Sequence, residues 1–488
     1  MACDELDYLT SRELVGLLAA RKVSAVELLD RSLKRIAMSD ERINAVVVRD
    51  FERARAAAAK ADAALARGER AALLGLPMTV KEAFNVAGLP TTWGFPAAKG
   101  FQPLEDALAI SRLKAHGAVI LGKTNVPVSL ADWQSYNDIY GTTNNPWDVR
   151  RTPGGSSGGS AASLAAGYVS LELGSDIGGS LRTPAHYCGV FAHKPSLSLA
   201  PLRGHTLPNM PALPFESDLA VIGPMARSAG DLGLALDIIA GPDELANGIA
   251  YRLALPPSRQ ETLAQFRVLV VDDHPLIATA ANVRAALDRL AERLSRLGAR
   301  VARASPLLPD LAEAARIYTR LLSSIFGALL ALDQYQRLEA VAKALPATDA
   351  SLAAWRARGS VISHREWIAS DAARSRLRQQ WRELFREWDV VLCPPMPSAA
   401  FPHDHSPEQS ARLIEIDGKT YPYLDQVVWP GIATLAGLPA TAAPIAISDS
   451  GLPIGVQIIG PYLEDRTTIG FAGLIEREFG GFRPPNPL

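Results

Sequence analysis

The chain has 488 residues, of which 48% are hydrophobic and 21% are charged, and its formal net charge is −1. This length and composition can bury a large core, and the balanced charge excludes the basic field with which a nucleic-acid-binding protein gathers phosphates. No run approaches the roughly 18 apolar residues of a transmembrane helix, so we expect no membrane partner.

The cysteines and the first residues bear on the cellular compartment. Cys3, Cys188 and Cys393 lie far apart without a C-x-x-C pattern, which is typical of reduced thiols and not of a disulfide framework. Cys188 stands in the string Y-C-G-V, which favours a buried thiol. The N-terminal string M-A-C-D-E-L-D lacks the basic and apolar regions of a secretory signal. We therefore expect a cytoplasmic protein.

Helices and short strands alternate over the first quarter of the sequence. Two capping boxes, Thr10-x-x-Glu13 and Ser24-x-x-Glu27, each precede an apolar helical pattern. The predicted helices cover 11–20, 25–37, 51–67 and 107–115, and the predicted strands cover 44–48, 75–80 and 119–122. Such alternation indicates an α/β fold.

Two turns rich in glycine and serine follow. The first is G-G-S-S-G-G-S over 154–160, and the second is G-S-D-I-G-G-S over 174–180. Between them, 160–167 is compatible with a helix and 168–173 alternates like a strand. Glycine lets backbone N–H groups turn inward, so a serine at the end of such a turn is exposed and surrounded by donors. An acyl-transfer nucleophile and its oxyanion hole need this arrangement.

The second half of the chain repeats the α/β texture without repeating these turns. Two predicted strands cover 266–271 and 390–393, and a third begins at 301. The predicted helices cover 282–297, 311–345 and 367–388. Segments 201–214 and 397–407 are rich in proline and glycine, which indicates long surface loops. The apolar run 321–332 is too short to span a membrane and indicates a buried helix or a pocket wall.

Four sequence strings in and after the two turns are together specific enough to indicate a protein family. They are G-G-S-S-G-G-S, G-S-D-I-G-G-S-L-R-T-P-A, C-G-V and K-P. Together they resemble the amidase signature family, the serine hydrolases that include fatty acid amide hydrolase, malonamidase and peptide amidase. Ser180 follows Ser156 by 24 residues, as in the family, and Lys81 matches the family's upstream lysine, although Glu82 replaces the usual aspartate after it. The resemblance runs over about 76–230 and 429–461.

This resemblance implies an α/β fold in a single large domain over 1–488, with a mixed central β-sheet covered by helices on both faces. The implied parts are N-terminal helices over 1–68, a core over 69–235, a variable helical and α/β portion over 236–428, and a C-terminal part of the core over 429–488. Relatives also suggest a homodimer.

The resemblance further implies the chemistry. Ser180 is the nucleophile, Ser156 takes its proton, and Lys81 takes the proton of Ser156; the relay later returns a proton to the leaving amine. The implied function is hydrolysis of the C–N bond of a small-molecule carboxylic amide through an acyl-enzyme. Lys81 must be neutral for part of this cycle, and burial at the end of an apolar strand would lower its pKa. A lone lysine at a strand end is more often solvated.

By the same resemblance, backbone N–H groups form the oxyanion hole, and other residues hold the turns or line the acyl pocket. The oxyanion-hole residues are Ile177, Gly178, Gly179 and Ser180. The residues that hold the turns are Ser157, Asp176 and Arg182. The candidates for the acyl pocket are Leu130, Trp133, Tyr136 and Trp429. The family places the Gly155–Ser156 peptide bond cis. Aromatic residues at the spacing of these pocket candidates are also typical of a core.

Three other motifs each lack a required part. The string G-S-S-G-G matches G-x-S-x-G with Ser157 as nucleophile, but no apolar strand precedes it. The glycine turns are not followed by the G-K-[ST] of a phosphate loop. His403-Asp404-His405 has no third metal ligand spaced nearby. We expect no metal and no cofactor.

Alternative functions stay open within and outside the enzyme class. Carbamates, esters and anilides are alternative substrates for the same mechanism. A glutaminase component of the tRNA amidotransferase would need partner chains. After the K-P string, S-L-S-L-A-P-L-R-G-H departs from the S-R-Y-G and S-S-L-D-Q-x-G-P strings of that component, although I-G-P over 222–224 is retained. The intact catalytic set argues against an inactive receptor on the same fold.

Overall fold

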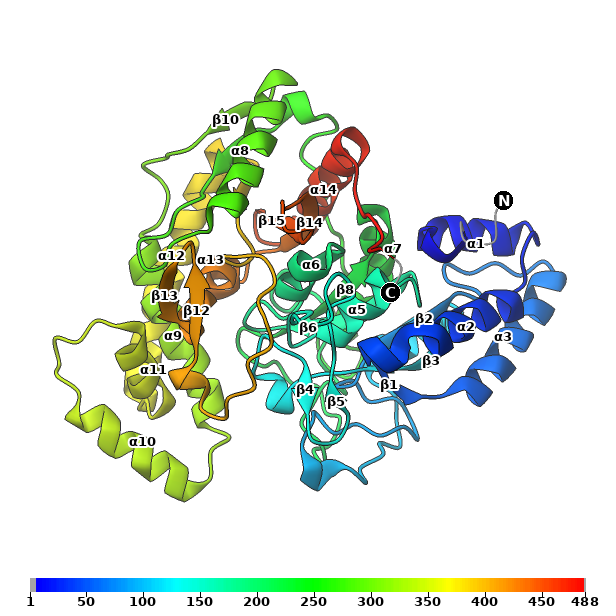
Figure 1. The fold of residues 1–488 in the computed structure, drawn as a ribbon, viewed down its shortest axis with the longest axis horizontal. Coiled ribbons are helices and arrows are strands. Elements are labelled where there is room, and N and C mark those ends of the chain that lie inside the picture. The colour runs from blue at the N-terminus through cyan, green and yellow to red at the C-terminus, as the bar shows by residue number, and fades with distance from the viewer. Residues whose placement is uncertain (1–5, 487–488) are drawn as a thin grey trace.

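One large mixed sheet organises the protein, and the computed structural model describes residues 6–486 (Figure 1). Its 11 strands lie in the order β1-β3-β2-β6-β8-β7-β14-β15-β11-β9-β10. The strands of this sheet are β1 Val46–Arg49, β2 Pro77–Lys81, β3 Val119–Thr124, β6 Leu171–Asp176, β7 Phe191–Lys194, β8 Val221–Ala226, β9 Arg267–Val270, β10 Arg300–Ala302, β11 Val390–Cys393, β14 Ala440–Ile447 and β15 Pro453–Ile459. Two short pairs lie apart, β4 Tyr136–Asn137 with β5 Gly141–Thr142 and β12 Leu413–Ile416 with β13 Lys419–Pro422.

Helices cover both faces of this sheet. Those of the described residues are α1 Ser11–Ala19, α2 Ala25–Ile43, α3 Phe51–Ala66, α4 Leu108–Ala115, α5 Gly158–Ala165, α6 Arg182–Cys188, α7 Ala229–Ile239, α8 Ala281–Arg296, α9 Leu311–Gly327, α10 Leu332–Ala344, α11 Leu352–Ser360, α12 His364–Glu387, α13 Val428–Ala436 and α14 Asp465–Phe479. Figure 1 shows α1–α3 at one end of the molecule and α9–α13 at the other. No helix within residues 6–486 combines the length and apolarity needed to cross a bilayer.

The strands separate two apolar clusters. Along β9, Val268 and Val270 pack into one cluster and Leu269 into the other. Side chains alternate between the two faces of a strand, so a strand that is apolar on both faces serves two helical layers. The predicted α/β architecture with a covered mixed sheet is therefore confirmed.

Parallel pairing in the centre of the sheet positions the candidate site. β2 runs parallel to both β3 and β6, with Thr79 opposite Glu172 and Val80 opposite Leu173. The carboxyl ends of β2 and β6 therefore meet at one edge of the sheet, where open α/β sheets bind their ligands. Lys81 ends β2, and Asp176 ends β6 at the second glycine turn.

Local sequence signals predict most elements well. Both capping boxes form: the Thr10 and Ser24 side chains accept hydrogen bonds from the backbone of Glu13 and Glu27, which bond back to the caps. Strand β11 has its predicted bounds. Cys188 is buried as predicted, whereas Cys3 lies outside the described residues.

One predicted strand is displaced. The alternation over 168–173 suggested a strand there, but β6 covers Leu171–Asp176, so it includes the start of the second glycine turn. Gly174 pairs with Gly223 of β8. A side chain on Gly174 would meet Leu181 and Ser157, so this glycine lets the strand pack closely against the first glycine turn and the start of α6.

One predicted helix is two helices. The pattern over 311–345 suggested a single helix, but α9 ends at Gly327 and α10 begins at Leu332. A side chain on Gly327 would overlap the carbonyl of Ser360, and one on Gly359 would overlap that of Arg320. These close contacts hold α9 against α11, a tertiary constraint that local periodicity does not reveal.

Candidate active site

The Lys81 amine is the buried centre of the candidate site. Every residue of β2 is buried, and Lys81 itself has no exposed surface. Its Nζ lies 2.7 Å from Ser156 Oγ and 2.9 Å from Ser175 Oγ. Both neighbours are hydroxyls, which can accept a hydrogen bond from the amine or donate one to it.

Burial decides the protonation of this amine. Desolvation lowers the pKa of Lys81 to about 7, although the charges of Asp176 and Glu172 oppose the change. Glu172 opposes it weakly at neutral pH, because burial raises the pKa of that carboxyl to about 8. The neutral and charged forms of Lys81 are therefore both populated near neutral pH.

The first glycine turn presents Ser156 to the amine and is tied to the second turn. The Gly155–Ser156 peptide bond is cis. Ser157 donates its backbone N–H to the carbonyl of Ser180 at 3.2 Å and its hydroxyl to the carbonyl of Ser175 at 3.2 Å. These bonds fix the two serine turns against each other.

A buried ion pair shapes the second glycine turn. Asp176 accepts hydrogen bonds from the backbone N–H of Gly179 at 2.9 Å and of Leu181 at 3.0 Å. Arg182 donates to both oxygens of Asp176, at 2.7 and 3.0 Å, and neither side chain is exposed. Burial disfavours the Asp176 carboxylate, but the charge and hydrogen bonds of Arg182, the charge of Lys194 and the Leu181 N–H together outweigh it and keep the pKa of Asp176 below its usual value.

Arg182 also ties this turn to the C-terminal part of the chain. Its guanidinium donates to the Pro430 carbonyl at 2.9 Å, to Thr434 Oγ1 at 2.8 Å and to Gln457. Each terminal nitrogen of the guanidinium thus has more than one acceptor. A planar five-donor fork suits such a set of fixed acceptors.

Two aromatic side chains orient the peptide groups of the same turn. Tyr318 of α9 donates its hydroxyl to the Ile177 carbonyl at 2.6 Å, and Trp133 donates its Nε1–H to the Gly178 carbonyl at 2.8 Å. In a trans peptide the C=O and the following N–H point in opposite directions. Fixing these carbonyls therefore fixes the N–H directions of Gly178 and Gly179.

The four predicted oxyanion-hole donors differ in their surroundings. The N–H of Gly179 is engaged by Asp176. Within residues 6–486, the N–H groups of Ile177, Gly178 and Ser180 form no hydrogen bond. Three of the four donors are thus free to bind an oxygen.

Two cavities meet at Ser180. The first, here named the Ser156 cavity, has a volume of about 410 Å³; apolar side chains from the 202–221 segment and from α9 form most of its wall, and Ser156 lines it. The second, here named the Arg356 cavity, has a volume of about 340 Å³ and is lined by Arg356 and Thr319 but not by Ser156. Ser180 and Ile177 line both.

Of the four predicted pocket residues, two line these cavities. Leu130 lines both cavities, and Trp133 lines the Arg356 cavity. Tyr136 lies outside them, where it stacks on His405 with ring centroids 3.8 Å apart. Trp429 is fully buried in α13 and packs edge-on against His274, so it belongs to the core.

The other predicted motifs do not converge on a second centre. The rings of His403 and His405 lie 5.3 Å apart, and no group of three potential metal ligands exists among residues 6–486. Burial raises the pKa of the Cys188 thiol far above its usual value, which makes this thiol unreactive.

The geometry agrees with comparisons to known proteins. The family described as Amidase matches residues 27–469. The chain belongs to the amidase family. One component of the glutamyl-tRNA(Gln) amidotransferase of Anaeromyxobacter sp. (strain K) is 34% identical over 511 residues, which cover 99% of each chain. AtzE, a component of the 1-carboxybiuret hydrolase of Pseudomonas sp. (strain ADP), is 34% identical over 457 residues, covering 92% of this amidase and 93% of AtzE.

Solved structures support the same family. One chain of an inhibitor-bound vestigial protein complex, described as revealing the evolutionary origins of an s-triazine catabolic enzyme, is 30% identical to this amidase; the match has a TM-score of 0.81 and covers 97% of this chain and 99% of the other. A bacterial aryl acylamidase has a TM-score of 0.80 at 23% identity over 97% of this chain and 96% of its own. Fatty acid amide hydrolase has a TM-score of 0.77 at 21% identity over 98% of this chain and 86% of its own. The last two show the fold alone.

The structure of this amidase adds residues that the sequence did not single out. Ser175 contacts the Lys81 amine, and its place in the G-S-D-I-G-G-S string was an available signal. Tyr318 orients the Ile177 carbonyl from a helix position 141 residues further along the chain. No local pattern around Tyr318 points to this contact.

Replacing Arg182 with leucine should destabilise this amidase strongly. The change leaves the Asp176 carboxylate buried and without its cation, which costs about 3–5 kcal/mol of unfolding free energy. Urea denaturation measures the loss. The matched control is Arg150→Ala, because Arg150 pairs with Asp148 at 3.0 Å while its side chain is 86% exposed. We expect no resolvable change in the midpoint of that control, and equal losses in the two variants would contradict the analysis.

Proposed function

We propose that this amidase hydrolyses the C–N bond of a small carboxylic amide through an acyl-enzyme on Ser180, with Lys81 as base and Ser156 as relay. One observation carries the proposal: the buried Lys81 Nζ lies 2.7 Å from Ser156 Oγ, and burial lowers the pKa of Lys81 to about 7. A neutral amine beside a hydroxyl can accept its proton, which a charged ammonium cannot do.

Acylation begins with attack of Ser180 Oγ on the amide carbon. The Ser180 proton passes to Ser156 Oγ as the proton of Ser156 passes to Lys81 Nζ, and a tetrahedral intermediate forms. The C–N bond then breaks, and the leaving nitrogen takes a proton from Ser156, which regains one from Lys81. The amine departs, the acyl group stays as an ester on Ser180, and Lys81 is neutral again.

Water completes the cycle by the same relay. A water molecule attacks the ester carbon while its proton moves through Ser156 to Lys81. Collapse of the second intermediate returns a proton to Ser180 Oγ and releases the carboxylic acid. In both intermediates the negative oxygen would accept hydrogen bonds from the N–H groups of Ile177, Gly178 and Ser180, and each such donor is worth about 3 kcal/mol.

The relay assigns the two halves of the substrate to the two cavities. The leaving nitrogen takes its proton from Ser156, so it must lie beside that hydroxyl. Ser156 lines the Ser156 cavity and not the Arg356 cavity. The amine half would therefore occupy the apolar Ser156 cavity, and the acyl half would occupy the Arg356 cavity.

The acyl half would carry a hydrogen-bond acceptor. Arg356 donates one Nη2–H to Asp425 at 2.9 Å, but its buried Nη1 has no partner within residues 6–486. The buried hydroxyl of Thr319 in the same wall also forms no hydrogen bond among these residues. Buried donors without partners are costly, so a carbonyl or carboxylate oxygen of the substrate suits this wall.

A second candidate function is that of a glutaminase that works with partner chains. The full-length match to a component of a glutamyl-tRNA(Gln) amidotransferase favours it. Glutamine releases only ammonia, however, which would fill little of the 410 Å³ Ser156 cavity. Glutamine hydrolysis that requires a co-purifying partner would favour this second candidate.

Replacing Ser180 with alanine should lower kcat by at least about 10³-fold on any substrate, because the acyl-enzyme cannot form. Substrates come from a panel of amides of varied acyl and amine size, with carbamates, esters and anilides included. A fluorophosphonate probe should label the wild-type protein at Ser180 and leave the variant unlabelled, as peptide mass spectrometry would reveal.

The matched control for Ser180 is Ser295→Ala on α8; among the residues that the structure describes, the Ser295 hydroxyl bonds only the Ala291 carbonyl of its own helix. This control should keep wild-type turnover and labelling. Turnover retained by the Ser180 variant, or a label on another residue, would overturn the assignment.

The rate should rise with pH through about pH 7. Lys81, with its pKa lowered to about 7, is protonated below that pH and cannot act as base; above it the amine is neutral and the rate reaches a plateau. The measurement is kcat/KM between pH 5.5 and 9.5, with circular dichroism verifying the fold at each pH. A flat profile would contradict a lysine base.

Replacing Arg356 with methionine should select against substrates with an acceptor on the acyl half. Loss of a charged hydrogen bond predicts a fall in kcat/KM of about 10- to 100-fold for such amides and little change for amides with plain alkyl acyl groups. Arg358→Met on the same helix is the control, because Arg358 bonds backbone carbonyls of Pro346 and Asp349 outside the cavity. A uniform loss across both substrate sets would refute this acyl site.

A further inference from the structure

Helix α12 carries an arginine stripe remote from Ser180. Arg374, Arg378, Arg382 and Arg386 recur at every fourth position. Residues four apart lie on one face of a helix, and like charges at this spacing repel each other. Such a stripe is tolerated only where each charge meets a partner or solvent.

The outer two members of the stripe have acidic partners. Arg374 pairs with Asp218 and with Asp371, each at 2.6 Å. Arg386 pairs with Glu383 at 2.6 Å. These carboxylates neutralise the two ends of the stripe.

The middle two members, Arg378 and Arg382, form no ion pair with a carboxylate of the described residues. Among residues 6–486, Arg378 makes a single hydrogen bond, from its Nε–H to the Ala436 carbonyl at 3.3 Å, and Arg382 makes neither a hydrogen bond nor an ion pair. Burial, followed by the charge of Arg374, lowers the pKa of Arg378. The charges of Asp371 and Asp218, which pair with Arg374, oppose this shift. Within the described residues, however, neither Arg378 nor Arg382 forms an ion pair of its own.

These two arginines line a surface pocket of about 470 Å³, here named the arginine pocket. It lies between α12, the end of α13 and the 461–464 segment, and Arg259 and Arg386 also line it. Its one carboxylate, Glu464, is occupied by Arg259 at 2.5 and 2.8 Å. The arginine pocket shares no lining residue with the two cavities at Ser180.

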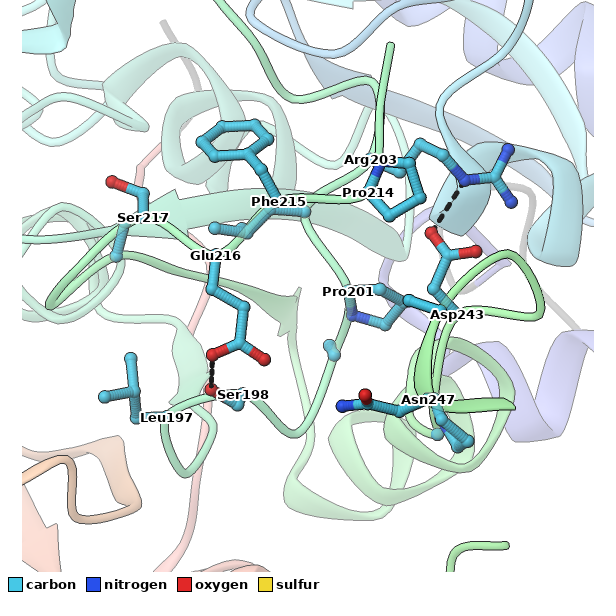
Figure 2. Close-up of a pocket in the computed structure, with 16 residues that line it drawn as sticks. Leu197, Ser198, Pro201, Arg203, Pro214, Phe215, Glu216, Ser217, Asp243 and Asn247 are labelled. Carbon is cyan, nitrogen blue, oxygen red and sulfur yellow. Dashed lines mark hydrogen bonds and ion pairs between the residues drawn. The ribbon is translucent and has the colours of Figure 1, made fainter. Parts of the chain in front are cut away.

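Another pocket of the protein is lined by acidic side chains as well as a basic one. Figure 2 shows a hollow of about 270 Å³ in which Glu216 accepts a hydrogen bond from Ser198 at 2.8 Å and Asp243 accepts one from Arg203 at 2.7 Å. Asp243 is thus paired with a cation, and Glu216 is held by a hydroxyl. The arginine pocket differs because four arginines and a single carboxylate line it.

The geometry points to a binding site for a diphosphate-bearing small molecule in the arginine pocket, with Arg378 and Arg382 as its principal ligands. Guanidinium groups bind phosphate through paired N–H donors, and two of them four residues apart can each take one phosphate group. The Tyr462 side chain lines the same pocket as both arginines. The pocket volume suits a diphosphate with an attached organic group.

This site is independent of the hydrolytic chemistry. None of its residues contacts Lys81, Ser156 or Ser180, so a failure of the proposed amide hydrolysis would leave it standing, and its own failure would leave the hydrolysis standing. The diphosphate could be free or part of a nucleotide. Both sources share the chemistry that the two arginines recognise.

Isothermal titration calorimetry of the full-length protein tests the site, with inorganic pyrophosphate and ADP as separate probes at constant ionic strength set with sodium chloride. Arg378→Gln and Arg382→Gln should each weaken binding by about tenfold or more. Arg376→Gln is the matched control, because Arg376 is exposed on the same helix and does not line the pocket. It should bind as the wild type does, and Ser180→Ala should do so too.

Each outcome decides the proposal. Tighter binding of ADP than of pyrophosphate supports a nucleotide in the pocket, and equal binding supports free diphosphate. Lack of binding of both probes at millimolar concentration overturns the site. So does an equal weakening by Arg376→Gln, which would mean that general surface charge attracts the anion. Arg382 is exposed, so its variant keeps the fold, and amide hydrolysis should be unchanged in it.

Discussion

The burial of one amine is the constraint on which the rest of the structure depends. Lys81 lies at the end of a fully buried strand and has hydroxyls, not carboxylates, as its hydrogen-bonding neighbours. Asp176, the carboxylate whose charge most favours the ammonium form, is held by Arg182 and by two backbone N–H groups. The ion pair therefore does two things: it shapes the second turn and it neutralises a charge that would otherwise keep the lysine protonated.

The second half of the chain acts on this centre through backbone carbonyls. Tyr318 reaches the turn from α9, and Arg182 reaches from the turn to the Pro430 carbonyl at the start of α13. A side chain on Gly431 would overlap the Tyr318 ring, so α9 and α13 pack at their closest beside the turn. Helix α9, which lies outside the stretches whose motifs resemble the family, thus orients a peptide group near Ser180.

Much of the fold could be predicted from local patterns, because capping boxes, apolar periodicity and strand composition act over a few residues. The exact bounds of β11 and the capped starts of α1 and α2 are examples. The misplacement of β6 and the break between α9 and α10 have one cause. In both places a glycine packs closely against another part of the chain, Gly174 against Ser157 and Leu181 and Gly327 against Ser360, and helical or strand periodicity does not record such contacts.

The candidate site, like the fold, could be predicted from the sequence only in part. The motif strings indicated Lys81 and Ser156, whose side-chain atoms lie in hydrogen-bonding distance. Cavity walls could not be predicted as well, since Trp429 is core and Arg356 lines a wall that no motif marks. The two cavities share part of α9, but the 202–221 loop lines only the Ser156 cavity and α11 lines only the Arg356 cavity. Preference for the amine and preference for the acid can therefore diverge by separate substitutions, so new substrate pairs can evolve without disturbing the shared reaction centre between them.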